Sequence, residues 1–150
     1  MPTLVTFLGG AVLLVALIQL ARIDWATHRL PNILTLPLIG AGLIWAFWTV
    51  DDLYPHLLGA ALGYGVFWAV EVAYRVIRKR DGLGRGDAKL LAVGGAWCGV
   101  WALPAIVLIA SLAALAYVLP KGEDRQTRLA FGPFLAVGIG GVWLVQRILS

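Results

Sequence analysis

Two aspartates, Asp24 and Asp87, are the residues of this sequence best placed to do chemistry together. They are 63 positions apart, yet each borders an apolar run: Asp24 follows the first run and Asp87 opens a later one. Two carboxyl groups held close together share one proton, because both cannot easily ionise. Such a pair can activate water as a general base and protonate a leaving amine as a general acid. This is the chemistry of an aspartyl protease, which needs neither a metal nor a covalent intermediate.

Each aspartate also has a purely structural interpretation. Asp87 can cap the N-terminus of the helix that it opens, since Asp is a favoured N-cap residue. Asp24 can form an ion pair with Arg22 or Arg29. The positions of the two aspartates alone leave both interpretations open.

A glycine-rich stretch leads into Asp87, and its sequence is Asp81-Gly82-Leu83-Gly84-Arg85-Gly86-Asp87-Ala88-Lys89. Glycine lets the backbone turn sharply and lets another chain approach closely. A phosphate-binding P-loop would instead end in Gly-Lys followed by Ser or Thr. Because this loop ends in an aspartate, which repels phosphate, we interpret it as a turn that presents a carboxyl group to a peptide.

The composition sets the surroundings of these residues. Of 150 residues, 61% are hydrophobic and 13% charged, and the mean hydropathy is +0.87. Soluble domains are about half apolar and about a quarter charged, and disordered chains are far less hydrophobic. The one cysteine, Cys98, has no internal partner for a disulfide. The sequence therefore predicts an all-α integral membrane protein. We attribute its net charge of +4 to basic residues in cytoplasmic loops rather than to nucleic-acid binding.

Six apolar runs are long enough to suggest about six transmembrane helices in a single domain over residues 1–150, with no room for a sizeable soluble domain. The predicted spans are Thr3–Ala21, Ile33–Val50, His56–Ile77, Ala88–Trp101, Pro104–Leu119 and Phe131–Leu149. The division between the fourth and fifth spans rests on Gly99 and Pro104 alone.

The basic residues support this count. Eleven of the twelve Lys and Arg residues fall in or beside three alternate loops, and Arg147 near the C-terminus is the exception. Positive residues mark the cytoplasmic side of membrane proteins. We therefore expect both termini outside the cytoplasm, and Asp24 and Asp87 at the cytoplasmic ends of their helices. Glu71 lies within the third span and is interpreted as an interfacial ion pair with Arg75, four residues on.

Three segments together resemble the type IV prepilin leader peptidases. Gly84-Arg85-Gly86-Asp87, followed by Lys89, is similar to the GxGD motif of that family. Asp24 and the basic loop ending in Pro31-Asn32 are similar to the segment that carries the first catalytic aspartate. The segment from Phe131-Gly132-Pro133 to Ala136 resembles a third signature, at the start of the last helix. The resemblance implies that Asp24 and Asp87 are the catalytic pair, that Gly84 and Gly86 shape the loop, and that Gly132 and Pro133 lie near the site.

The same resemblance implies a substrate and a location. We expect cleavage of the short basic leader of type IV prepilins, or of the related pseudopilins of type II secretion, at the cytoplasmic face of a bacterial inner membrane. Larger relatives carry an additional domain with paired CxxC motifs associated with N-methylation. This sequence begins at its first span and has one cysteine, so we expect a short form with peptidase activity alone. Presenilin-type proteases share GxGD but place a Tyr-Asp pair in the partner helix, whereas Ile23 precedes Asp24 here.

Several expectations remain for the other residues. Lys89 is interpreted either as an interfacial lysine or as a residue that orients the aspartates or meets an acidic residue of the pilin. His28 and His56 have no partners at metal-ligand spacing, so no metal and no cofactor are expected. The alternative function is a non-enzymatic membrane subunit or ion-translocating protein, which would explain the intramembrane Glu71. The sequence does not indicate an oligomeric state.

Overall fold

The computed structural model describes residues 2–79, 85–121 and 130–150, and these form a bundle of helices with no strand among them. The α-helices are α1 (Pro2–Thr27), α2 (Asn32–Thr49), α3 (Tyr54–Arg78), α4 (Arg85–Cys98), α5 (Leu103–Val118) and α6 (Gly132–Leu149). Two short 3₁₀ helices, η1 (Val100–Ala102) and η2 (Leu119–Lys121), flank α5. The predicted all-helical class is therefore confirmed.

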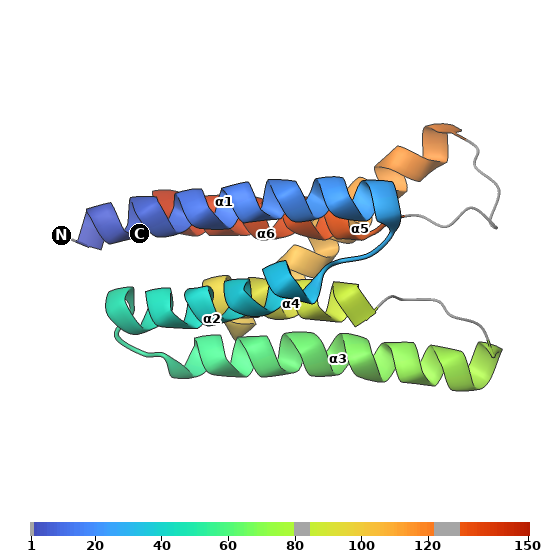
Figure 1. The fold of residues 1–150 in the computed structure, drawn as a ribbon, viewed down its shortest axis with the longest axis horizontal. Helices are drawn as coiled ribbons and strands as arrows, with labels where there is room; N and C mark the ends of the chain where they lie inside the picture. The colour runs from blue at the N-terminus through green and yellow to red at the C-terminus, as the bar shows by residue number, and fades with distance from the viewer. Residues whose placement is uncertain (1, 80–84, 122–129) are drawn as a thin grey trace.

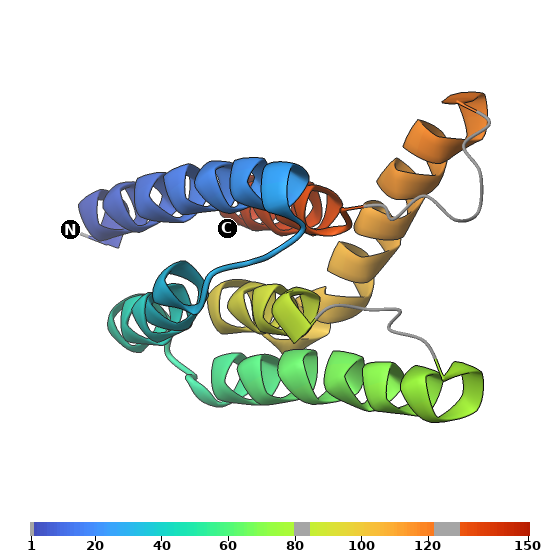
Figure 2. The same cartoon turned by 45° about the vertical axis from the view of Figure 1, so that its right-hand side comes forward.

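The ends of the helices divide between two ends of the bundle (Figure 1). At one end lie the last residues of α1, α3 and α5 and the first residues of α4 and α6, whereas both chain termini lie at the other. Figure 2 shows that α5 is tilted strongly against the other helices. The predicted alternation of connections between the two ends is thus present in the fold.

Five helical stretches among the described residues are long and apolar enough to cross a membrane, rather than the predicted six. They are 4–27, 32–49, 54–77, 100–121 and 132–149. The missing one is α4, whose 14 residues make about 21 Å of helix against about 30 Å of hydrocarbon. It also begins at Arg85 and ends at Cys98, three residues before each predicted boundary. The helix ends there because Gly99 leaves the helical conformation, with φ +88°.

α4 is short because it is the core of the bundle rather than part of its exterior. It packs against α2, α3, α5 and α6, and every residue from Leu90 to Gly99 is buried. Glycines bring α3 and α4 into backbone contact: a Cβ atom on Gly59 would lie 2.7 Å from the carbonyl oxygen of Gly95. Small residues permit such close approach between helices in membranes.

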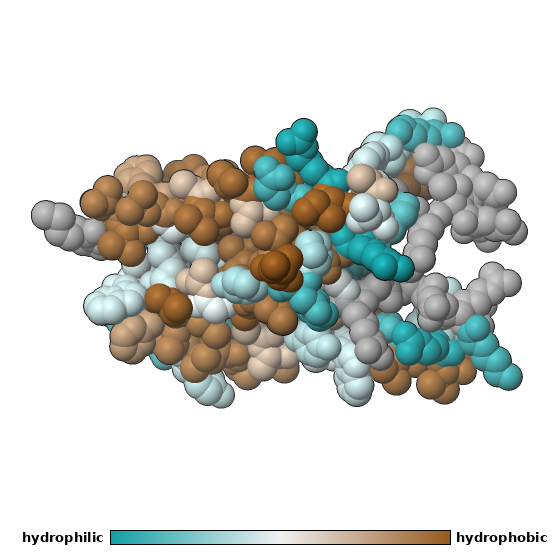
Figure 3. Space-filling model, in the orientation of Figure 1, coloured by the Kyte–Doolittle hydropathy of each residue, from teal (hydrophilic) through white to brown (hydrophobic). Residues whose placement is uncertain are grey.

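The outer surface of the bundle is apolar. Large side chains on different helices point outward, among them Phe7 on α1, Phe47 on α2 and Ile148 on α6, with 76%, 65% and 81% of their surface exposed. Figure 3 shows hydrophobic side chains over most of one face and hydrophilic ones gathered toward the end where α1 and α3 finish. Since soluble monomers rarely expose apolar patches of this extent, the surface fits a multi-pass membrane protein.

Candidate active site

Asp24 lies on the last turns of α1 and is buried, with 5% of its surface exposed. The prediction that it follows the end of the first helix is wrong, because α1 continues past Ala21 to Thr27. The helix ends where His28 adopts a left-handed conformation, with φ +54°. A rigid helix, not a loop, therefore holds the Asp24 carboxyl group.

The start of α6 supplies the partner of Asp24. The backbone N–H of Gly132 donates a hydrogen bond of 2.9 Å to Asp24 Oδ2. The first N–H groups of a helix have no partner inside the helix, and the N-terminal end of its dipole favours an anion. A Cβ atom at position 132 would overlap Oδ2, so glycine is the residue that leaves the carboxyl group in this position. Oδ1 of Asp24 has no hydrogen-bond donor among the described residues.

Asp87 is the third residue of α4 and is partly buried. The structural interpretation of Asp87 as an N-cap is wrong, because the helix begins two residues earlier at Arg85. An aspartate in the first turn still interacts favourably with the helix dipole. Gly84 lies outside the described residues, so its predicted role in shaping the loop is not addressed by the fold.

The connection between α1 and α2 packs onto the first turn of α4. Leu30 in this connection is buried, and a Cβ atom on Gly86 would lie 2.9 Å from Leu30 Cβ. Beside this contact, Lys89 Nζ donates a hydrogen bond to Asn32 Oδ1 at the start of α2. Asp24 precedes the connection by one helical turn and Asp87 follows Gly86 directly, so both aspartates lie at the same end of the bundle.

The start of α4 is recessed from the end of α3. Gly63 on α3 faces Leu91, since a Cβ atom on Gly63 would lie 2.8 Å from the Leu91 carbonyl oxygen. In an antiparallel pair this places Asp87 near the level of Phe67, and α3 continues beyond that level by about 16 Å at the rise of an α-helix. Figure 1 likewise shows α3 extending past the end of α1 and the start of α4.

The structure also shows where the other residues named from the sequence lie. The expected pair of Glu71 and Arg75 is confirmed: Arg75 Nη2 donates to Glu71 Oε1, and Glu71 is buried. Pro133 follows Gly132 in the first turn of α6. Among the described residues, no three His, Cys, Asp or Glu side chains form a group that could hold a metal ion.

Sequence reasoning missed the roles of Leu30 and Asn32, although both lie in the loop that it singled out. Their partners are 56 and 57 positions away, and nothing local marks such contacts. The hydrogen bond from Gly132 did have a signal. A glycine followed by proline at a helix start presents a backbone N–H with no partner inside the helix.

Comparisons with known proteins agree with the resemblance in the three segments. The model of the type IV leader peptidase family matches residues 11–119. The prepilin leader peptidase/N-methyltransferase of Escherichia coli (strain K12) is 44% identical over 125 residues, which are 81% of this chain and 56% of that protein. The protein of the same name from Dickeya chrysanthemi is 41% identical over 150 residues, 95% of this chain and 52% of that protein.

The protein of that name from Xanthomonas campestris pv. campestris is 41% identical over 137 residues, which are 86% of this chain and 47% of that protein. The chain thus spans about half the length of these curated relatives. No solved structure matches it.

Proposed function

This chain belongs to the type IV leader peptidase family, and from that premise we propose that it is a membrane aspartic endopeptidase. Its substrates are type IV prepilins or related pseudopilins, and Asp24 and Asp87 are its catalytic pair. The bond cleaved joins the short basic leader to the hydrophobic helix of the pilin, at the membrane surface.

The packing of the α1–α2 connection on α4 is the observation that carries this proposal. Leu30, three residues after the end of α1, packs against Gly86 in the first turn of α4. This contact anchors the chain that leaves the Asp24 turn of α1 beside the residue that precedes Asp87. A pair of carboxyl groups can act on one substrate only if the fold brings their helices together. Asp24 is further held by the N–H of Gly132, so its orientation is set before any substrate binds.

In the proposed reaction, the ionised aspartate takes a proton from water while the oxygen of that water attacks the scissile carbonyl carbon. The protonated aspartate hydrogen-bonds the carbonyl oxygen. The C–N bond then breaks, and the new amino terminus of the pilin takes up a proton from the pair. In this proposal the proton belongs to the pair rather than to either carboxyl group. Gly132 donates to only one oxygen of Asp24, which leaves the other for water.

We further propose that the end of the bundle with Asp24 and Asp87 faces the cytoplasm and that both termini lie outside, in a bacterial inner membrane. Basic residues at that end support the orientation: Arg22 lies on the last turns of α1, Lys79 follows α3, and Lys121 ends η2. Positive residues favour the cytoplasmic side. The basic leader of a prepilin would meet the catalytic pair at this surface.

A cleavage assay with the purified chain and a prepilin in detergent or liposomes tests the proposal. Asp24→Asn and Asp87→Asn should each reduce the cleavage rate by at least about 100-fold, because each removes an acid–base group. Asp51→Asn is the matched control, since Asp51 is exposed in the α2–α3 connection at the opposite end of the bundle. Normal cleavage by either of the first two variants would refute the catalytic pair, whereas no cleavage by the unaltered chain would favour a non-enzymatic membrane subunit.

A further inference from the structure

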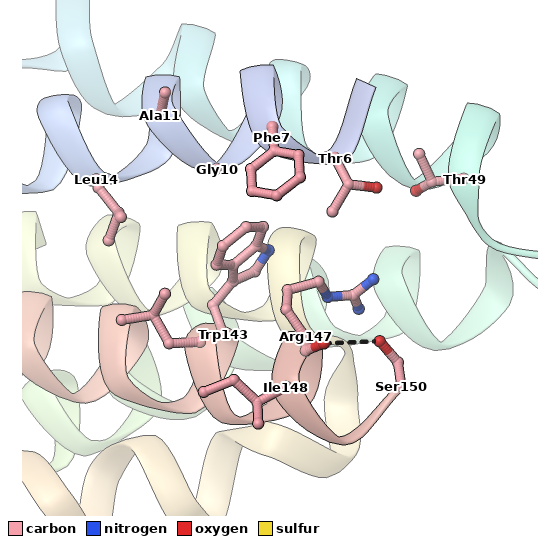
Figure 4. A pocket seen from close by; sticks show the side chains of 11 residues that line it. Thr6, Phe7, Gly10, Ala11, Leu14, Thr49, Trp143, Arg147, Ile148 and Ser150 are labelled. Atoms are coloured by element: carbon pink, nitrogen blue, oxygen red, sulfur yellow. Dashed lines mark hydrogen bonds between the residues drawn. The ribbon is translucent and has the colours of Figure 1, made fainter. Parts of the chain in front are cut away.

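A groove lies between α1 and α6 at the end of the bundle that carries the chain termini (Figure 4). Its volume is about 900 Å³, within the range of small-ligand sites. Phe7 and Leu14 on α1 and Leu144 and Ile148 on α6 form its apolar wall. Because most of the Phe7 and Ile148 side chains are exposed, the groove opens on the outer surface of the bundle.

This groove is separate from the candidate active site. Thr6, which also lines it, lies eighteen residues before Asp24 on the continuous helix α1. Eighteen residues of α-helix span about 27 Å. The two sites therefore lie near opposite surfaces of a bilayer.

One cation contributes to the lining of the groove. Arg147 on α6 contributes to the lining, and its guanidinium group stacks over the rings of Trp45 and Trp143, 5.0 and 5.8 Å from their centroids. No carboxylate among the described residues pairs with it. A charged group between apolar side chains at a membrane surface is costly unless a counter-ion accompanies it.

The two tryptophans that the cation stacks on, of which only Trp143 lines the groove, have buried hydrogen-bond donors without acceptors. Nε of Arg147 and the indole Nε1 atoms of Trp45 and Trp143 are all buried and have no hydrogen-bond partner. Buried donors of this kind are rare in folded proteins and need an explanation. The unpaired charge of Arg147, with Trp143 beside it in the lining of the groove, favours a ligand group that is anionic and rich in acceptor oxygens.

We propose that this groove binds an anionic phospholipid, with the phosphodiester at Arg147 and an acyl chain along the α1–α6 wall. A phosphodiester carries one negative charge and only accepts hydrogen bonds, and the planar fork of a guanidinium matches it. Figure 4 shows the Arg147 side chain directed toward the space between Thr6, Thr49 and Ser150, at the mouth of the groove. The apolar wall that continues from this mouth suits a lipid chain rather than a free anion.

The charge of the site selects the class of phospholipid. A zwitterionic phosphatidylethanolamine would bring an ammonium group close to the guanidinium of Arg147, and like charges repel. Phosphatidylglycerol carries no such cation. We therefore expect the site to prefer phosphatidylglycerol over phosphatidylethanolamine.

Native mass spectrometry of the delipidated chain in detergent measures this binding. We expect one phosphatidylglycerol to bind at least about tenfold more tightly than a diacylglycerol with the same chains, since hydrogen bonds to a charged group supply that difference. Arg147→Gln should remove the difference, whereas Lys121→Gln, which removes a charge at the other end of the bundle, should retain it. Millimolar inorganic phosphate should not displace the lipid.

A second pair of variants tests the apolar wall and does not depend on Arg147. Ala11→Trp fills the groove, because Ala11 lines it, and should weaken phosphatidylglycerol binding. Ala61→Trp is the matched control on the exposed face of α3 and should leave binding unchanged. Unchanged binding in both Arg147→Gln and Ala11→Trp would overturn the proposal. Displacement by phosphate alone, or equal affinity for phosphatidylethanolamine, would overturn the assignment to an anionic lipid.

Discussion

The backbone N–H of Gly132 donates a hydrogen bond of 2.9 Å to Oδ2 of Asp24 across 108 positions of sequence. This bond joins the first residue of α6 to the last turns of α1. It uses an N–H that a helix start leaves without a partner, and it fixes the carboxyl group that we propose to be catalytic.

Gly132→Ala should therefore impair cleavage without touching either aspartate. The new Cβ atom would overlap Asp24 Oδ2, so the carboxyl group must move and its hydrogen bond to the N–H must lengthen. A displacement of about 1 Å can cost about 100-fold in rate. The measurement is kcat for prepilin cleavage by protein that is normally inserted in the membrane.

The control for this variant lies on the same helix. A Cβ atom on Gly141 meets nothing within 4 Å, so Gly141→Ala should keep the wild-type rate. Equal rates for the two alanine variants would show that the hydrogen bond does not position Asp24 for catalysis.

The contact between Leu30 and Gly86 can be tested by a disulfide. In a Cys98→Ser background, Leu30→Cys combined with Gly86→Cys should form a crosslink on oxidation. The two Cβ positions lie 2.9 Å apart, close enough for a small movement to reach the usual 3.5–4.5 Å. We expect a shift on non-reducing gels that a thiol reverses.

Leu30→Cys combined with Gly65→Cys serves as the control, because a Cβ atom on Gly65 meets nothing within 4 Å. Crosslinking in both pairs, or in neither, would mean that the connection after α1 does not pack stably on α4.

The helices of this fold were largely predictable from sequence, because each outer helix buries only one face and must be apolar along its length in a membrane. The positions at which the helices end were less predictable. Arg22 and Asp24 suggested that the first helix ends before them, yet α1 continues to Thr27. Inside this helix the carboxyl group of Asp24 accepts a hydrogen bond from the N–H of Gly132. A local sequence pattern cannot reveal a hydrogen-bond partner that lies 108 positions away.

α4 shows the same limit in another way. As the central helix, it is covered by its neighbours, so it needs neither the length nor the continuous hydrophobicity of a lipid-facing span. Asp87 and the glycines before it pointed to a site from sequence alone. The contacts that hold the site together, from Leu30 to Gly86 and from Asn32 to Lys89, depend on how α2 and α4 pack.

The backbone contact of α3 with α4 predicts a loss of stability in Gly95→Ala. The added Cβ atom would overlap the carbonyl group of Gly59, and a backbone cannot rotate away as a side chain can. Overpacking of this kind costs about 1–3 kcal/mol. Thermal unfolding in detergent should show a lower melting temperature, whereas Gly40→Ala, where the Cβ atom meets nothing within 4 Å, should not. A wild-type melting temperature for Gly95→Ala would contradict the close approach of these helices.

The hydrogen bond from Lys89 to Asn32 distinguishes between the roles expected for this lysine. Because Asn32 already holds the ammonium group, we expect Lys89 to position the first turn of α4, and with it Asp87, rather than to bind an acidic residue of the pilin. Lys89→Met should then lower kcat several-fold and leave KM unchanged, and Asn32→Leu should do the same.

The double variant of Lys89 and Asn32 should be no worse than either single one, because the effects of residues that share one interaction are not additive. Lys121→Met, which removes an exposed lysine at the same end, should leave both constants unchanged. A raised KM with normal kcat in Lys89→Met alone would instead assign the lysine to substrate binding.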